Sequence, residues 1–193
     1  MIPFVPTAAP LQAQINAFIP SCPQEEFDRR LLLTYLRQFD NLLTRENALC
    51  HFTGSAWIIN ATHTRVLMIY HNIYQSWSWV GGHADGEADL LAVAMREAQE
   101  ETGVTRITPL RSEPLSLEIL PVDSHIKRGA FVSAHLHLNL TYLLQADDAE
   151  ATKVKPDENS GVLWMTPSEA VSRSTEPCMQ VIYQKLNGKL GLA

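Results

Sequence analysis

Residues 81–104 read GGHADGEADLLAVAMREAQEETGV, and this stretch points to both the fold and the chemistry of the chain. A glycine pair breaks the preceding apolar run, and a strongly patterned helix is predicted to follow. On that helix Glu97, Glu100 and Glu101 stand three and four residues apart, so their carboxylates share one face. Because like charges so close repel one another, their placement favours a site where a cation neutralises them. Gly103 follows the last turn and suits a left-handed helix end.

The acidic face predicts a site for Mg²⁺ or Mn²⁺, since it offers hard oxygen ligands without His or Cys. Gly82 allows the backbone to approach the metal, so its carbonyl is a further candidate ligand. Mg²⁺ shares its coordination shell with substrate phosphates and orients a water for attack. The predicted chemistry is therefore attack of water on a diphosphate. A solvated acidic helix face is the plainer interpretation of such a cluster alone, but the glycine pair and the Arg96-Glu97 pair favour the metal site.

The segment resembles the Nudix box, G-x5-E-x7-R-E-U-x-E-E-x-G-U, in which U is a bulky aliphatic residue. The matching positions are Gly82, Arg96, Glu97, Glu100, Glu101, Gly103 and Val104. The resemblance implies an α/β/α sandwich with a mixed sheet, and a Mg²⁺-dependent hydrolase of nucleoside diphosphates linked to another group. It also implies that Glu97, Glu100 and Glu101 are metal ligands or the general base. Arg96 would hold the carboxylates by ion pairing.

Two positions depart from the box. Ala88 stands where the pattern has its first Glu, and Glu87 is the neighbouring carboxylate that can replace it near the substrate. Ala98 is smaller than the usual aliphatic residue, which changes only packing. The substitution at Ala88 motivates an alternative, a catalytically silent Nudix-fold module that binds or senses a nucleotide. The retention of Glu97 favours turnover, and an isoprenoid diphosphate isomerase is disfavoured because neither Cys50 nor Cys178 has a catalytic context.

Other residues are candidates for the same site. Glu158, in a polar loop before a short strand, is predicted as a further ligand or the base, with an ordinary solvated loop as an equal alternative. His83 follows Gly82 directly and is expected to contact substrate. His135 and His137 lie two apart on a predicted strand and face the same way. They can contact phosphate or bind zinc with a third ligand, although hydrogen-bonded structural imidazoles are the more frequent case.

The remaining pattern divides the chain into a helical extension, residues 1–50, and a Nudix-type domain, residues 51–193. Apolar spacing predicts a helix from Pro23 to about Leu43. Trp77-Ser78-Trp79 is expected either to offer a stacking surface for a base or to form a strand against the N-terminal helices. Further expected elements are a hairpin over 55–60 and 65–70, strands over 115–122, 134–144 and 162–165, a polar connection over 123–130, and helices beginning after Thr166 and spanning 177–186.

Composition limits the partners. The 193 residues carry a net charge of −6, which argues against nucleic acid or an anionic membrane surface. Three widely spaced cysteines, no signal peptide and no apolar membrane span indicate a cytoplasmic protein without disulfides. The expected partner is a small nucleoside diphosphate-type substrate. Homodimers are common among Nudix proteins, so a homodimer is also expected; the sequence does not specify which substrate is cleaved.

Overall fold

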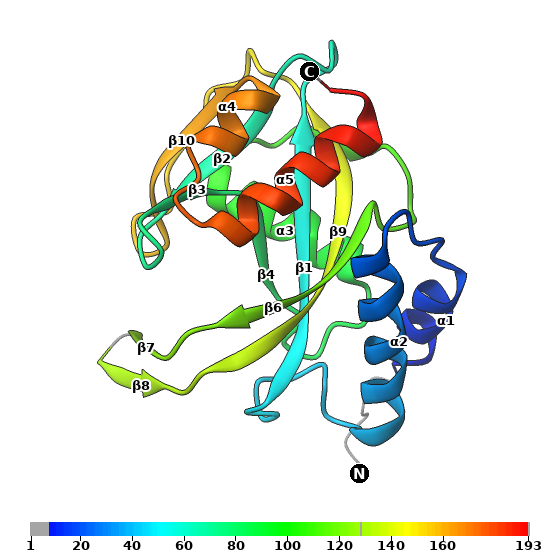
Figure 1. The fold of residues 1–193 in the computed structure, drawn as a ribbon. Helices are drawn as coiled ribbons and strands as arrows, with labels where there is room; N and C mark the ends of the chain where they lie inside the picture. Colours follow the sequence, from blue (N-terminus) through cyan, green and yellow to red (C-terminus); the bar gives the residue numbers. More distant parts are fainter. Residues whose placement is uncertain (1–7, 128, 193) are drawn as a thin grey trace.

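The computed structural model describes residues 8–127 and 129–192, and it shows a curled mixed sheet with helices on both faces (Figure 1). The central path of the sheet runs β10–β2–β1–β9–β5, with β3 paired to β2, β4 to β1 and β6 to β9. These strands are β1 (Cys50–Ile59), β2 (Val66–His71), β3 (Ser76–Ser78), β4 (Val80–His83), β5 (Ile107–Pro109), β6 (Ser116–Val122), β9 (His135–Ala146) and β10 (Asn159–Met165). The expected α/β architecture is confirmed.

The sheet is mixed because β1 and β9 run parallel while their other neighbours pair antiparallel. The parallel register extends from Cys50 opposite Leu136 to Ile59 opposite Gln145. All of β1 is buried, as expected for a strand covered on both faces. This central pair sets the positions of His51, His135 and His137, which face the cavity described below.

Helices cover the two faces with separate apolar clusters. On one face α3 (Leu90–Thr102) packs on β1 and β4, and Phe52 and Ile58 point toward it. On the other face α4 (Pro167–Ser172) and α5 (Pro177–Leu190) cover Trp57 and Ile59. The capping box expected at Thr166 is present. None of the helices in the described part of the chain combines the length and the apolar character that crossing a bilayer requires.

The tryptophan segment packs against the C-terminal helices, which corrects the expectation that it faces the N-terminal ones. The Trp79 ring lies 5.6 Å from that of Tyr183 on α5. Arg173 at the end of α4 lies 4.8 Å over the ring of Trp77. The sequence alone cannot distinguish these partners, because both helical layers are amphipathic.

The N-terminal helices are α1 (Ala9–Ala17) and α2 (Pro23–Gln38). Leu11, Ile15 and Leu32 are buried in the same apolar cluster as α3. The prediction that the second helix continues to Leu43 is wrong. Phe39 has extended backbone angles, and Leu42 and Leu43 are buried from a non-helical segment. Asp40 and Asn41, which lie between Phe39 and Leu42, have low helix propensity. A prediction from apolar spacing alone does not take that propensity into account.

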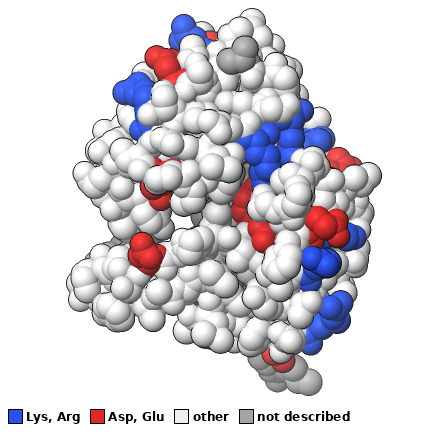
Figure 2. All heavy atoms as spheres, in the orientation of Figure 1, with Lys and Arg blue, Asp and Glu red and all other residues white. Residues whose placement is uncertain are grey.

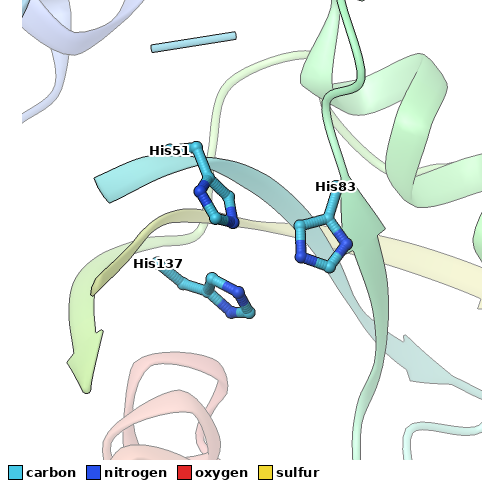
Figure 3. A group of neighbouring side chains, drawn as sticks. All are labelled: His51, His83 and His137. Carbon is cyan, nitrogen blue, oxygen red and sulfur yellow. The ribbon is translucent and has the colours of Figure 1, made fainter. Parts of the chain in front are cut away.

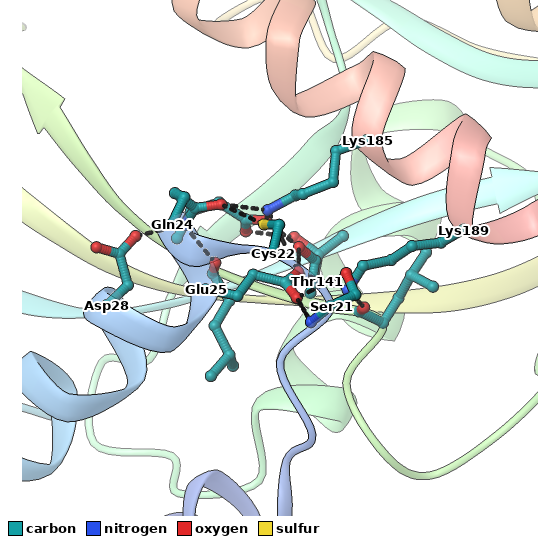
Figure 4. A network of polar contacts seen from close by, with 12 residues as sticks. Ser21, Cys22, Gln24, Glu25, Asp28, Thr141, Lys185 and Lys189 are labelled. Carbon is teal, nitrogen blue, oxygen red and sulfur yellow. Dashed lines mark hydrogen bonds and ion pairs between the residues drawn. The ribbon is translucent and has the colours of Figure 1, made fainter.

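A buried ionic network ties α2 to α5 (Figure 4). Glu25 is fully buried and accepts hydrogen bonds from Ser116 Oγ at 2.7 Å and from Lys189 Nζ at 2.5 Å. Lys185 Nζ lies 3.4 Å from Glu25 and donates to Glu118 at 2.9 Å. Buried carboxylates are stable only when paired in this way. The N-terminal layer is therefore held by charge as well as by apolar packing.

Two further expectations are corrected. Residues 123–130 do not form only a polar connection: β7 (His125–Lys127) and β8 (Ala130–Val132) make an antiparallel hairpin that projects from the body (Figure 1). The glycine pair does not break the sheet, because Gly81 and Gly82 lie within β4 and pair with β1. Strand geometry is accessible to glycine, and close neighbours explain why no larger residue occupies these positions. A Cβ atom at Gly81 would stand 2.4 Å from Oγ of Ser55 on β1, and one at Gly82 would meet Glu97 on α3.

Candidate active site

A cavity of about 590 Å³ opens between the sheet, α3 and the projecting hairpin. In Figure 2 the surface is hollowed between the lobe that carries α4 and the β7–β8 hairpin. The size lies within the usual range for small-molecule sites. The predicted site residues that line it are Gly82, His83, Glu97, Glu100, Glu101, His135, His137 and Glu158.

Local capping fixes the helix that carries the carboxylates. Asp89 begins α3 and accepts hydrogen bonds from the backbone N–H groups of Leu91 and Ala92, both at 3.1 Å. Gly103 ends the helix with a φ of 72°, and its N–H donates to the Gln99 carbonyl at 2.9 Å. The left-handed end predicted for Gly103 is confirmed. A helix held at both ends presents its acidic face at a fixed position beside β4.

The glycine pair lets β4 lie directly against this acidic face. A Cβ atom added at Gly82 would stand 2.3 Å from Cδ of Glu97, so only glycine leaves the carboxylate its space. The N–H of Gly81 donates to Oε2 of Glu101 at 3.3 Å. The backbone therefore approaches two of the predicted metal ligands closely enough to share a small site with them.

Three carboxylates meet in the cavity. Oxygen atoms of Glu97, Glu101 and Glu158 all lie within 4.8 Å of one another. Glu158 comes from the loop before β10, as the sequence suggested. Glu100 lies beside this trio and forms an ion pair of 3.0 Å with Lys155, which also pairs with Glu158 at 2.9 Å. The cluster therefore combines two positions from one helix with a third from a distant loop.

Two members of the trio hold a proton more strongly than free carboxylates do. Burial, together with the negative charges of Glu97 and Glu158, raises the pKa of Glu101 to about 9. Burial likewise raises the pKa of Glu97, against the opposing effect of Lys155. Arg96 offers Glu97 a contact of only 3.5 Å. Carboxylates in this state fit a divalent cation, which would stabilise their ionised forms.

The structure places Glu87 apart from the trio. Its side chain is exposed and accepts a hydrogen bond from the N–H of Asp89 at 2.9 Å, at the start of α3. Ala88 is partly buried and packs against the core beneath this turn. In the described structure Glu87 is not among the residues that line the cavity. It is thus not brought together with the other predicted site residues.

Four histidines gather in the same cavity. His83 comes from β4, His135 and His137 from β9, and His51 from β1. In Figure 3 the rings of His51, His83 and His137 point toward one another. No sequence motif indicates His51, because it joins the cluster only through the parallel register that sets it opposite His137.

Lys155 was also not anticipated. It lies in a loop with several acidic residues, so the sequence does not show which carboxylates it pairs with. Its position three residues before Glu158 is the one local indication of that ion pair. Burial alone would lower the pKa of Lys155, but the two carboxylates beside it raise that pKa overall. Lys155 therefore stays charged and holds Glu100 and Glu158 in place.

Comparisons with known proteins agree with this architecture. The family model described as NUDIX domain matches residues 51–186. The structure of a C. elegans Ap4A hydrolase in a binary complex aligns with a TM-score of 0.54 at 16% identity, covering 72% of this chain and 97% of that one. The Nudix hydrolase RenU of M. Smegmatis aligns with a TM-score of 0.53 at 14% identity, covering 73% and 86%. A search of curated proteins finds no match. At these identities the structural likeness concerns the fold.

Proposed function

This chain belongs to the Nudix hydrolase family, and on that premise we propose that it cleaves a diphosphate linkage in a nucleoside diphosphate derivative with the help of Mg²⁺ or Mn²⁺. The observation that carries the proposal is the meeting of Glu97, Glu101 and Glu158 in one cavity. The cavity has room for a small molecule, and its acidic wall needs a cation before it can accept phosphates.

The donor set fits a hard divalent cation. Glu97, Glu101 and Glu158 would hold it, with Glu100 and the carbonyl of Gly82 as further candidate ligands. Such an ion, when bound, neutralises phosphate oxygens and lowers the pKa of a coordinated water. All of the proposed ligands are oxygens, which favours Mg²⁺ or Mn²⁺ over softer metals.

The chain's own residues supply positioning and proton transfer. Of the two partly buried members of the trio, Glu158 has the more exposed side chain, at 28% against 15% for Glu97. The oxygen of Glu158 that does not hold the ion would therefore accept the proton of the attacking water. The water oxygen bonds to phosphorus, the bond from phosphorus to the bridging oxygen breaks, and the bridging oxygen leaves on a phosphate. Lys155 would position Glu158, Arg96 would restrain Glu97, and His83, which lines the cavity, would contact substrate.

The test is a phosphate-release assay with a coupled phosphatase, run with Mg²⁺ and with Mn²⁺. The panel contains nucleoside triphosphates, nucleotide sugars, ADP-ribose, NADH, CoA and dinucleoside polyphosphates. Ap4A belongs in it because one similar structure is an Ap4A hydrolase. We expect metal-dependent turnover of at least one member, and a loss of at least about 100-fold in kcat for Glu101→Gln and for Glu158→Gln.

The matched control is Glu113→Gln, which removes an exposed carboxylate outside the cavity and should leave turnover unchanged. Turnover that survives both Glu101→Gln and Glu158→Gln would contradict the proposed site. No turnover across the panel, with nucleotide binding still seen by calorimetry, would instead identify a binding module. That outcome would indicate that the alanine at position 88, in place of the first Glu of the Nudix box, marks a loss of catalysis.

A further inference from the structure

His51, His135 and His137 have no role in the proposed hydrolysis, and they form a cluster with His83, the proposed substrate contact. Ring centroids lie 5.1 Å apart for His51 and His83, 5.2 Å for His51 and His137, and 5.0 Å for His83 and His137. One ring nitrogen from each of these three lies within 4.8 Å of the other two (Figure 3). His135 stacks on His51 at 4.8 Å. Three strands thus direct imidazoles to one point in the cavity.

The tautomers of two rings are fixed by backbone carbonyls. Nδ1 of His51 lies 3.2 Å from the Asn47 carbonyl, and Nδ1 of His135 lies 2.8 Å from the Ser133 carbonyl. A carbonyl can only accept, so the proton of each neutral ring sits on Nδ1 and the lone pair on Nε2. This arrangement is the one that outer-shell carbonyls impose on metal-binding histidines.

The buried ring of His51 independently indicates a ligand site. Its side chain is 4% exposed, and its Nε2 has no hydrogen-bond partner among the described residues. A buried imidazole lone pair without a partner costs free energy unless something occupies it. The same nitrogen is directed at the point where His83 and His137 converge. The stacking of His135 on the His51 ring does not give this nitrogen a hydrogen-bond partner.

We propose that His51, His83 and His137 bind a divalent transition metal of the Zn²⁺ class. Neutral imidazoles suit Zn²⁺, Fe²⁺, Co²⁺ and Cu²⁺, whereas Mg²⁺ prefers oxygen. His51 is buried while the other two ligands are half-buried and face the cavity, so the fourth position opens to water or to an anionic group. A small inward movement is enough, because tetrahedral Zn²⁺ places its nitrogen ligands roughly 3.3 Å apart.

His135 supports this site as a positioning residue. Its Nε2 lies 3.2 Å from Nε2 of His137, so in the metal-free protein His137 is held by that contact. The stacked ring of His135 also fixes the orientation of His51. The new site and the carboxylate trio share one cavity, since His83 follows Gly82 on β4 and Gly82 lies against Glu97. The cavity would thus hold two metals of different chemistry.

The test titrates Zn²⁺ into chelator-treated full-length protein in the presence of excess Mg²⁺. We expect one equivalent to bind tightly, and each of His83→Ala and His137→Ala to weaken binding by more than the roughly 10- to 100-fold that loss of an outer-shell partner costs. His63→Ala, which removes an exposed histidine in the turn after β1, is the matched control and should bind normally. Co²⁺ bound to wild-type protein should give the intense visible absorption of a four-coordinate site, which requires no variant to fold.

Three results would overturn the proposal. They are the absence of stoichiometric Zn²⁺ binding by the wild type, unchanged binding after both histidine substitutions, and loss of binding in Glu101→Gln. The last result would place the ion in the carboxylate trio. Because the readout is metal binding, the outcome does not depend on whether the hydrolase assay succeeds.

Discussion

Replacing Glu25 by Gln tests whether the buried ionic network stabilises the fold. The substitution keeps the size of the side chain but removes the charge that Lys189 and Lys185 neutralise. Burial alone would raise the pKa of Glu25, but hydrogen bonds from Lys189, Ser21 and Ser116 lower it from 4.5 to about 2. Each tenfold change in the acid constant corresponds to about 1.4 kcal/mol, so the network contributes about 3 kcal/mol near neutral pH.

A second argument gives a similar free energy for the Glu25 network. Removing one partner of a buried ion pair costs about 3 to 5 kcal/mol, because the other charge stays buried without compensation. The side chain of Lys189 is only 14% exposed, so water cannot fully replace Glu25. For a chain of this length, about 3 kcal/mol corresponds to a fall in Tm of roughly 6 to 12 °C.

The assay is urea unfolding followed by tryptophan fluorescence, for the wild type, Glu25→Gln and Glu26→Gln. Glu26 is exposed on the same turn of α2, so its substitution should change the free energy of unfolding by less than about 0.5 kcal/mol. Because the folded-state pKa of Glu25 is depressed, its stabilisation is present above the unfolded pKa and is lost as pH falls toward the folded one.

The pH series provides the decisive comparison. The difference between wild type and Glu25→Gln should be full at pH 6 to 7 and should shrink to less than half at about pH 3. Equal effects of Glu25→Gln and Glu26→Gln would refute the reasoning. A difference that stayed constant across this pH range would show that lost packing, not charge, is responsible.

Three further substitutions test other parts of the structure. Gly82→Ala places a Cβ 2.3 Å from Cδ of Glu97, so turnover should fall at least about tenfold while the urea midpoint changes little; normal kcat would contradict the close approach. Gly188→Ala meets no atom within 4 Å inside α5 and should stabilise the protein by about 0.5 to 1 kcal/mol in urea unfolding; a lower stability would contradict the open space at this helix position. Thr166→Ala removes the cap that accepts from the N–H of Glu169 at 3.2 Å and should cost about 1 kcal/mol in urea unfolding with unchanged turnover. An effect on turnover equal to that of Gly82→Ala would instead link α4 to the cavity.

Local features of the site could be predicted from the sequence. The helix from Leu90 to Thr102 follows from apolar spacing, and its left-handed end follows from Gly103. The capping box at Thr166 is likewise a local signal. These features could be predicted because the residues that cause each of them lie close together in the sequence. The same holds for the shared face of Glu97 and Glu101.

Long-range partners could not be predicted in this way. His51 meets His137 only because two strands 86 residues apart pair in parallel, and no spacing in the sequence encodes that register. The error at the end of α2 has a related cause: Leu42 and Leu43 continue a helical pattern but are buried by tertiary packing. Periodicity gives the wrong boundary there because it takes account neither of the low helix propensity of Asp40 and Asn41 nor of the packing that buries the two leucines.

The ion pair between Glu25 and Lys189 also bears on how the protein is made. Its partners are separated by 164 residues, so on a ribosome that adds roughly 5 to 20 residues per second Glu25 waits on the order of ten to thirty seconds for its cation. Until α5 emerges, Glu25 has Ser21 and Ser116 as hydrogen-bond partners but no cation to neutralise its buried charge. We therefore expect stable docking of the N-terminal helices to require α5 and to follow its synthesis.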